Sequence, residues 1–216
     1  ARCNAFGIGY VFQNKEFDYL ILMDGDGEDR PIEIKALVEK TLKNPNVSVV
    51  AKRVKRSEGF LFQFLYQVHK LITFIFTGKK INFGNYSCLT QQDIKILSDK
   101  ASLWSSFSGT IKKNLTNLNE VDSIRGLRYF GPSKMSLFNL AIHSFSIIAV
   151  FKNTVFLRST FMIIILSFLI KPLGLFAIIF QVLIVFFNLI IFIVSLRENE
   201  KEFIKSNENV LDEITQ

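Results

Sequence analysis

Four carboxylates occur within six residues near the start of this chain, separated in part by two glycines; they are Asp24, Asp26, Glu28 and Asp29. Carboxylates so close together repel one another, and a divalent cation relieves that repulsion. Oxygen ligands suit Mg²⁺ or Mn²⁺, and glycines allow a tight turn and the close approach of a phosphate. The segment therefore predicts a site for a metal and a phosphorylated ligand. An acidic turn that caps a helix beginning at Pro31 is the alternative explanation.

Two basic clusters follow later in the sequence. The first lies within residues 52–56, and the second contains Arg125, Arg128 and Lys134. A net charge of +7 suits nucleic acid, an acidic membrane surface or a phosphorylated substrate, because all three attract Lys and Arg. Neither cluster belongs to a recognisable nucleic-acid-binding module, so we do not expect nucleic acid as a partner. A basic surface facing anionic lipid remains one interpretation, and a diphosphate bound with a metal is the other.

The elements that would position these residues follow an α/β pattern. The apolar run 17–23 predicts a buried parallel strand that ends at the acidic segment. Residues 31–42 predict a helix and 47–51 a second strand, which gives a strand–loop–helix–strand unit. Further on, we expect a strand at 81–83, a helix at 91–97 and a strand at about 123–130. Open α/β sheets bind ligands at the carboxyl ends of their strands, which is where the acidic segment falls.

Apolar residues recur along one face of the segment from Phe60 to Phe76 and predict a helix that ends near Gly78. Two interpretations of this helix stay open. It packs its apolar face against the core, or it lies on a membrane surface.

The last third of the chain is strongly apolar, and 49% of all residues are hydrophobic. Residues 134–152 mix polar and apolar side chains and predict an interfacial amphipathic helix. Residues 153–196 predict a transmembrane hairpin with a turn at Lys171–Gly174, although one span with a re-entrant segment fits as well. Basic residues flank both ends of this hairpin. They place the preceding domain and the tail, residues 197–216, in the cytoplasm. Cys3 and Cys88 have no metal-ligand spacing, which agrees with a reduced compartment.

Four segments resemble motifs of one family, in that family's order. The strand followed by Asp24-Gly25-Asp26 and Pro31-Ile32-Glu33 is similar to the acidic segment of family-2 glycosyltransferases, and especially of the polyprenyl-phosphate sugar transferases akin to dolichyl-phosphate mannose synthase. The three other matching segments are Arg2–Gly7, Val49–Arg53 and Arg128–Lys134. Apolar helices follow the last motif, as they do in the membrane-anchored members of the family.

The resemblance implies a GT-A-type, Rossmann-like nucleotide-sugar domain over residues 1–133, truncated at its N-terminus. It implies an inverting transfer from a nucleotide-sugar donor to a lipid-phosphate acceptor at a membrane. Asp24 and Asp26 would act in catalysis and hold Mg²⁺ or Mn²⁺ with the help of Glu28. The residues that would contact the donor or acceptor phosphates are Arg53, Arg128, Ser133 and Lys134. The resemblance leaves a homo-oligomer open.

One position departs from the family's pattern. Asn85 stands in a segment where relatives often carry an aspartate, and an amide cannot act as a carboxylate base. A lipid phosphate is already ionised near neutral pH and needs no such base. Asn85 is therefore compatible with a lipid-phosphate acceptor, whereas a hydroxyl acceptor would need a base from elsewhere, such as Asp24 or Asp26. A non-catalytic scaffold of the same fold and a glycosyltransferase for a non-lipid glycan are the alternatives.

Overall fold

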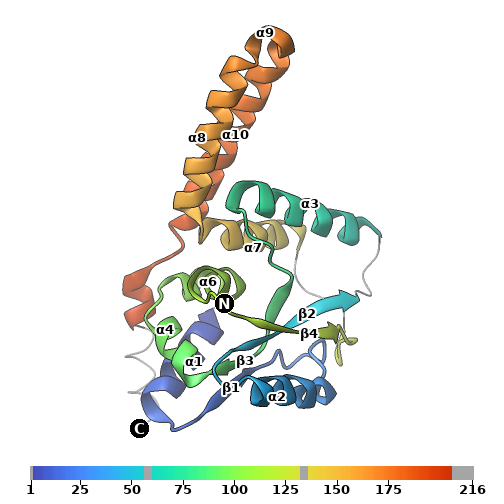
Figure 1. The fold of residues 1–216 in the computed structure, drawn as a ribbon, viewed down its shortest axis with the longest axis vertical. Helices are drawn as coiled ribbons and strands as arrows, with labels where there is room; N and C mark the ends of the chain where they lie inside the picture. Colours follow the sequence, from blue (N-terminus) through green and yellow to red (C-terminus); the bar gives the residue numbers. More distant parts are fainter. Residues whose placement is uncertain (1, 56–59, 132–135, 206–216) are drawn as a thin grey trace.

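The computed structural model describes residues 2–55, 60–131 and 136–205 of the 216-residue chain. These residues form a mixed α/β body and a long helical arm that projects from it (Figure 1). The arm comprises residues 152–195.

A four-stranded mixed sheet lies at the centre of the body, in the order β1-β3-β2-β4. The strands are β1 (Tyr19–Leu22), β2 (Val49–Lys55), β3 (Phe83–Thr90) and β4 (Asn119–Ile124). Both β1 and β2 pair antiparallel with β3, and β2 pairs parallel with β4. It follows that β1, β2 and β4 run in one direction and β3 runs in the opposite direction.

Four strand predictions need correction. The strand expected at 47–51 is β2, which runs from Val49 to Lys55. The strand at 17–23 was expected to pair parallel, but β1 pairs antiparallel with β3, because β3 lies between β1 and β2. The strand expected at 81–83 runs from Phe83 to Thr90. The strand expected at 123–130 is β4, which ends at Ile124. The first residues of β4 are polar, so an apolar pattern could not reveal where this strand begins. Its position is set by its pairing with β2.

The helices of the body cover both faces of the sheet. The predicted helix at 31–42 consists of η1 (Pro31–Glu33) and α2 (Ile34–Lys43). The helix predicted at 60–76 is α3 (Phe60–Thr77). The helix predicted at 91–97 is α4 (Gln91–Ser98), capped by the Thr90 hydroxyl, which accepts from the Asp93 N–H. Three helices were not predicted, namely α1 (Arg2–Asn14), α5 (Ser102–Ser105) and α6 (Phe107–Asn114).

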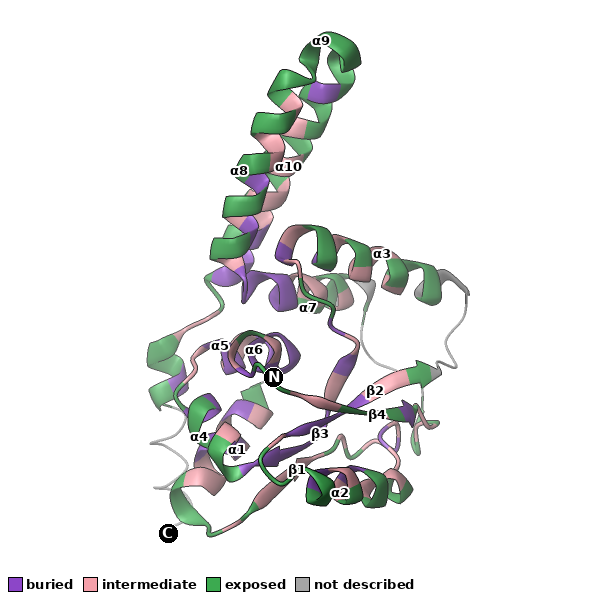
Figure 2. Ribbon diagram, in the orientation of Figure 1, coloured by how far each residue is buried: buried purple, intermediate pink, exposed green. Residues whose placement is uncertain are grey.

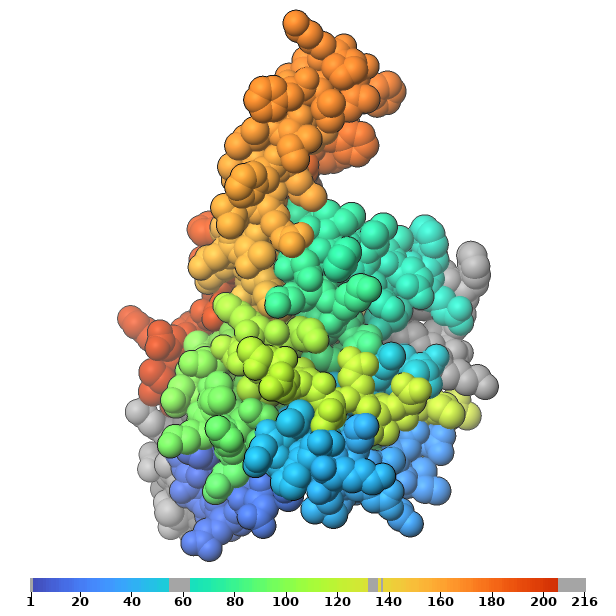
Figure 3. Space-filling model, viewed as in Figure 1, coloured from blue at the N-terminus to red at the C-terminus, as the bar shows by residue number. Residues whose placement is uncertain are grey.

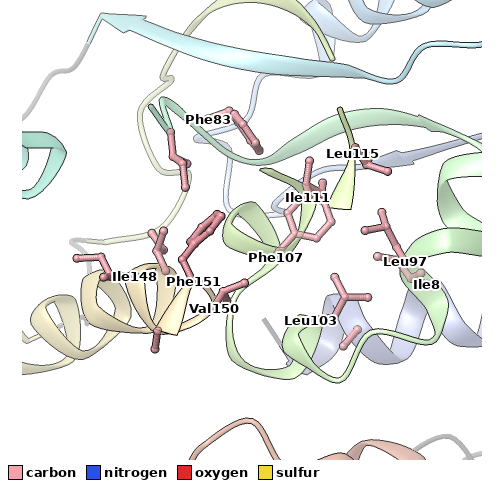
Figure 4. Packing of buried hydrophobic residues seen from close by; sticks show 14 of the residues in the cluster. Ile8, Phe83, Leu97, Leu103, Phe107, Ile111, Leu115, Ile148, Val150 and Phe151 are labelled. Atoms are coloured by element: carbon pink, nitrogen blue, oxygen red, sulfur yellow. The ribbon is translucent and has the colours of Figure 1, made fainter. Parts of the chain in front are cut away.

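Apolar side chains of alternate strand residues build a core on each face of the sheet. Val49 and Cys88 pack with Leu37 of α2 on one face. Val50 and Leu89 belong to a larger cluster on the other face. Figure 4 shows Phe107 of α6 at the centre of that cluster, between residues of α1 and α5 and residues at the end of α7.

The arm consists of α8 (Lys152–Phe168), α9 (Ile170–Leu173) and α10 (Leu175–Ser195), and it follows α7 (Leu137–Ala149). Helices α8 and α10 lie side by side, with α9 at the tip (Figure 1). The larger core cluster continues into the base of the arm through Val155 and Ile191. Most residues of the remaining arm are exposed, as Figure 2 shows, and the large ones among them are mostly apolar. The space-filling view in Figure 3 shows the arm projecting from the body.

Within the described residues, one helical segment, 175–205, is long and apolar enough to cross a membrane. Its most apolar 18 residues have a mean hydropathy of 3.0, and only 11% of that window is buried. Helix α8 is long and apolar enough to span a membrane only when it is counted together with α7, and the axes of these two helices meet at a bend of 86°. In the described part of the chain there is thus one candidate spanning helix, or two if the bent pair of α7 and α8 is counted as one span. The predicted hairpin is not confirmed, and one span with a re-entrant segment remains the alternative prediction.

Candidate functional site

One edge of the sheet gathers most of the residues that the sequence singled out. Asp24 follows β1, Arg53 lies near the end of β2, and Arg125 follows β4. Because β3 runs in the opposite direction, Asn85 near its start lies at this same edge, as the pairing of Lys52 with Phe83 shows. We call the charged residues here the charged edge; its members are Asp24, Asp26, Glu28, Asp29, Arg53, Arg125 and Arg128.

Two arginines bind the carboxylate of Glu28. Arg125 Nη2 contacts Glu28 Oε2, and Arg128 Nε donates to Glu28 Oε1 at 2.8 Å. Burial by itself would raise the pKa of Glu28, but the hydrogen bonds from Arg128 and Arg125 outweigh it and hold that pKa below its usual value. The hydrogen bond to Glu28 in turn raises the pKa of Arg128. Glu28 is therefore an ionised anchor for both guanidinium groups.

Arg128 also reaches Asp26, with 3.1 Å between Nη2 and Oδ2. The other oxygen of Asp26, Oδ1, accepts the backbone N–H of Glu28 at 3.0 Å. The structure therefore pairs Arg128, a predicted phosphate ligand, with two of the three predicted metal ligands. Arg125 was part of a basic cluster in the sequence but was not among the predicted site residues. Its place three residues before Arg128 was the available signal.

The acidic loop and the loop after β4 form one packed unit. Gly126 N–H donates to the carbonyl of Glu28 at 2.8 Å, and Tyr129 N–H donates to the carbonyl of Asp26 at 2.9 Å. Gly27 has φ +91°, and a Cβ added there would lie 2.9 Å from the Tyr129 ring. A glycine at position 27 is thus required by both backbone conformation and space.

Asp29 is a structural residue rather than an exposed ligand. Its carboxylate is 4% exposed and accepts the Asp24 N–H at 3.0 Å. Arg53 Nη2 lies 3.8 Å from its other oxygen, and Gly84 leaves space for that guanidinium. Burial raises the pKa of Asp29 despite these partners. The alternative explanation, that the acidic segment caps the helix at Pro31, is not observed, because Arg30 is the N-cap and has no capping side-chain bond.

Asp24 faces β3. The Asn85 amide donates to Asp24 Oδ1 at 3.0 Å, so Asn85 contacts a predicted metal ligand. Next to it, the Tyr86 hydroxyl donates to the carbonyl of Arg30 at 2.8 Å. Burial and the nearby carboxylates raise the pKa of Tyr86 to about 12. The sequence analysis assigned no role to Tyr86, which holds the end of the acidic loop against the sheet.

The described residues include no group of three or more His, Cys, Asp or Glu side chains that could hold a metal ion. Mg²⁺ in phosphate-binding sites commonly takes only one or two protein carboxylates and completes its shell with substrate phosphates and water. Asp24 fits that requirement best, since the Asn85 bond occupies Oδ1 alone. Asp26 and Glu28 would need to exchange arginine contacts for a metal. Ser133 and Lys134, two predicted phosphate ligands, lie outside the described residues.

A cavity of about 580 Å³ lies between α7, the start of α1 and α5. His143 of α7 lines it. The residues that line the cavity are Arg2, Cys3, Trp104, Ser105, Asn139, Ile142, His143, Ser146 and Arg197.

No protein-family model matches this chain, and no curated protein sequence matches it. The assignment of a function therefore depends on the residues and their geometry.

Proposed function

We propose that this chain is the membrane-anchored, metal-dependent catalytic part of a glycosyltransferase with a GT-A-type fold. It transfers a sugar, with inversion, from a nucleotide-sugar donor to a lipid acceptor such as polyprenyl phosphate. The observation that carries the proposal is the charged edge, where carboxylates and guanidinium groups meet at the ends of three strands that run in one direction. A site for a diphosphate and a metal needs both signs of charge at this place.

In this proposal, residues of the charged edge bind a metal and a diphosphate, and Asp26 exchanges its contact with Arg128 for the metal. Asp24 and Asp26 would hold Mg²⁺ or Mn²⁺, which supplies positive charge to the departing diphosphate. Arg128 already bridges Asp26 and Glu28, so a phosphate arriving there offers it a new anionic partner. Glu28 keeps Arg125 and Arg128 in position before the ligand binds.

Asn85 supports a phosphate acceptor rather than a hydroxyl acceptor. Its amide donates to Asp24 and cannot remove a proton, whereas an ionised lipid phosphate attacks without a base. The candidate spanning helix would place the reaction at a membrane, where such an acceptor is found. The basic residues on both flanks of the arm favour a cytoplasmic catalytic domain. The arm would then be a transmembrane hairpin, with α7 as an interfacial helix.

The test is a transfer assay with membranes that carry the full-length protein and a set of radiolabelled nucleotide sugars. We expect label in the lipid phase that depends on Mg²⁺ or Mn²⁺. Asp26→Asn should reduce this transfer by about 100-fold or more, the usual cost of losing one preorganised charge partner in a transition state. Asp122→Asn is the matched control, because Asp122 is exposed on β4.

Full activity of folded Asp26→Asn protein would overturn the site. Label in water-soluble glycan would replace the lipid acceptor with another one. An intact protein that transfers none of the sugars would support the scaffold alternative.

A further inference from the structure

Helix α3 turns much of its apolar surface outward. The large apolar side chains on this surface are 37–59% exposed; they are Phe64, Leu65, Leu71, Phe74 and Ile75. The opposite side of the helix carries the buried hydroxyls of Thr73 and Thr77. Among the α3 side chains that the structure describes, Ile72 and Phe76 pack against the larger core cluster. Such an arrangement leaves several large apolar side chains in water unless another surface covers them.

The position of α3 indicates what covers this surface. It lies beside α7 at the foot of the arm (Figure 1), and the ring of Phe76 packs at a tilt against Phe187 of α10 with ring centroids 4.2 Å apart. Arg158 of α8 donates to the carbonyl of Ile75 at 3.1 Å. Gly78, with φ +70°, leaves the space that the Arg158 guanidinium needs. These contacts fix α3 to the base of the arm.

The bend between α7 and α8 gives the direction of the membrane relative to these helices. Because the two helices meet at 86°, an arm that crosses a bilayer places α7 along the bilayer surface. Helix α3, next to α7 and attached to the same base, then lies at the same level. Both α3 and the arm carry large apolar side chains that are exposed.

The charges on α3 suit an anionic lipid surface. Residues 60–82 contain no Asp or Glu. Lys80 lies over the Phe74 ring, with 5.6 Å from Nζ to the centroid, and Lys70 lies over the Tyr66 ring at 5.4 Å. Lysines beside aromatic rings at a helix surface are typical of helices that lie in the headgroup region.

We infer that α3 is a second interfacial helix, which inserts its outward apolar surface into the cytoplasmic face of an anionic bilayer. This inference rests on the membrane anchoring in the proposed function. It also positions the charged edge, because β2 ends at Lys55 and α3 begins at Phe60. Five residues span at most about 18 Å. The end of β2 is therefore held close to the headgroups, where a lipid phosphate would be located.

The test uses an environment-sensitive fluorophore on single cysteines of the full-length protein in bilayers that contain anionic lipid. Exposed Cys3 is replaced by serine, and buried Cys88 is kept. Leu71→Cys, 59% exposed in the wild type, reports on α3, and Phe186→Cys, also 59% exposed, reports on the arm. Lys35→Cys on α2 is the water-exposed control.

We expect the probe at position 71 to show a blue shift and quenching by lipid-attached nitroxides, as the probe at 186 does, while the probe at 35 shows neither. A lipid signal at 186 with a water signal at 71 would overturn the inference and leave the anchoring intact. A water signal at 186 would overturn both. Disulfide cross-linking between two copies at position 71, without quenching by lipid, would show that a second copy covers α3 and would also overturn it.

Discussion

The charged edge and the helical arm differ in how their polar groups are satisfied. At the charged edge, carboxylates and guanidinium groups from two loops pair with one another, and Glu28 alone binds two arginines. In the arm, Lys171 is the only charged residue between Ser159 and Leu196. The polar side chain of Gln181 bonds within the arm, to Ser167 and to the carbonyl of Ile163.

This difference indicates which surroundings suit each region: a charged ligand at the charged edge, and lipid around the arm. The Arg128–Asp26 pair of the charged edge is partly exposed, so a ligand of the same charge can replace one partner at modest cost. The backbone of the arm forms its hydrogen bonds within its helices, and the side chain of Gln181 bonds to α8, so the outer surface of the arm can face lipid. The charged edge is suited to binding, and the arm is suited to a fixed position in a membrane. Three predictions test this comparison.

The largest effect is expected at the charged edge. Arg125→Met removes one of the two arginine partners of Glu28. The side chain of Arg125 is only 16% exposed and that of Glu28 only 13% exposed. We expect the free energy of unfolding to fall by about 2 kcal/mol, because a largely buried carboxylate loses a charged hydrogen bond. Denaturation followed by the fluorescence of Trp104, the single tryptophan, measures the change.

Lys52→Met is the control, since the Lys52–Glu120 pair is about 40% exposed and should contribute no more than about 0.5 kcal/mol. Equal losses in the two variants would contradict the distinction between a buried ion pair at the site and an ordinary surface pair.

A smaller effect is expected from protonation. The pKa of Glu28 is depressed below its ordinary 4.5, so Glu28 contributes stability above pH 4.5 that is lost as the pH falls through its folded pKa. The pKa of Asp29 is raised above 3.8, so its contribution is present below pH 3.8 and is lost as the pH rises through its folded pKa. Glu28→Gln should therefore weaken the acid-induced loss of stability.

Denaturation midpoints measured as a function of pH would test this. Asp29→Asn is the paired variant and should make the acid-induced loss steeper, because it removes the opposing contribution. The same slope in both variants and the wild type would show that these carboxylates do not determine the acid response.

The smallest effect is expected in the arm. Gln181→Leu removes both hydrogen bonds from α10 to α8, but Leu suits a lipid environment. Hydrogen bonds between membrane helices contribute about 0.6 kcal/mol on average, so we expect a change of that size or less in bilayers. Thermal unfolding followed by circular dichroism in vesicles measures it. A large loss would mean that α10 depends on polar contacts and that packing alone does not hold the arm.

Local patterns predicted several elements and could not predict others. Helices α2, α3 and α4 were found because apolar spacing and helix-start signals such as Pro31 act within a few residues. Helix α6 was missed, although the Ser106 hydroxyl caps it by accepting from Gly109 N–H. It contains a glycine and few strong helix formers. Its first five residues are buried, so tertiary packing compensates for weak local propensity.

The candidate site was predicted in composition but not in arrangement. The acidic loop and the two basic clusters were visible as charge patterns. Their mutual pairing was not visible, because Arg125 and Glu28 are 97 residues apart and meet only where β1 and β4 end at one sheet edge. Asn85 was recognised as a departure from the family pattern, while its bond to Asp24 became evident from the structure.

The sequence by itself determined where the apolar residues concentrate, where helices of strong periodicity form, and which short segments carry charge. These properties depend on neighbours along the chain. Only the tertiary structure decided that β3 runs between β1 and β2, that arginines hold the carboxylates of the acidic loop, and that α3 turns its apolar surface outward. Those outcomes depend on which distant segments compete for the same core and on the direction in which each strand enters the sheet. A local pattern contains neither kind of information.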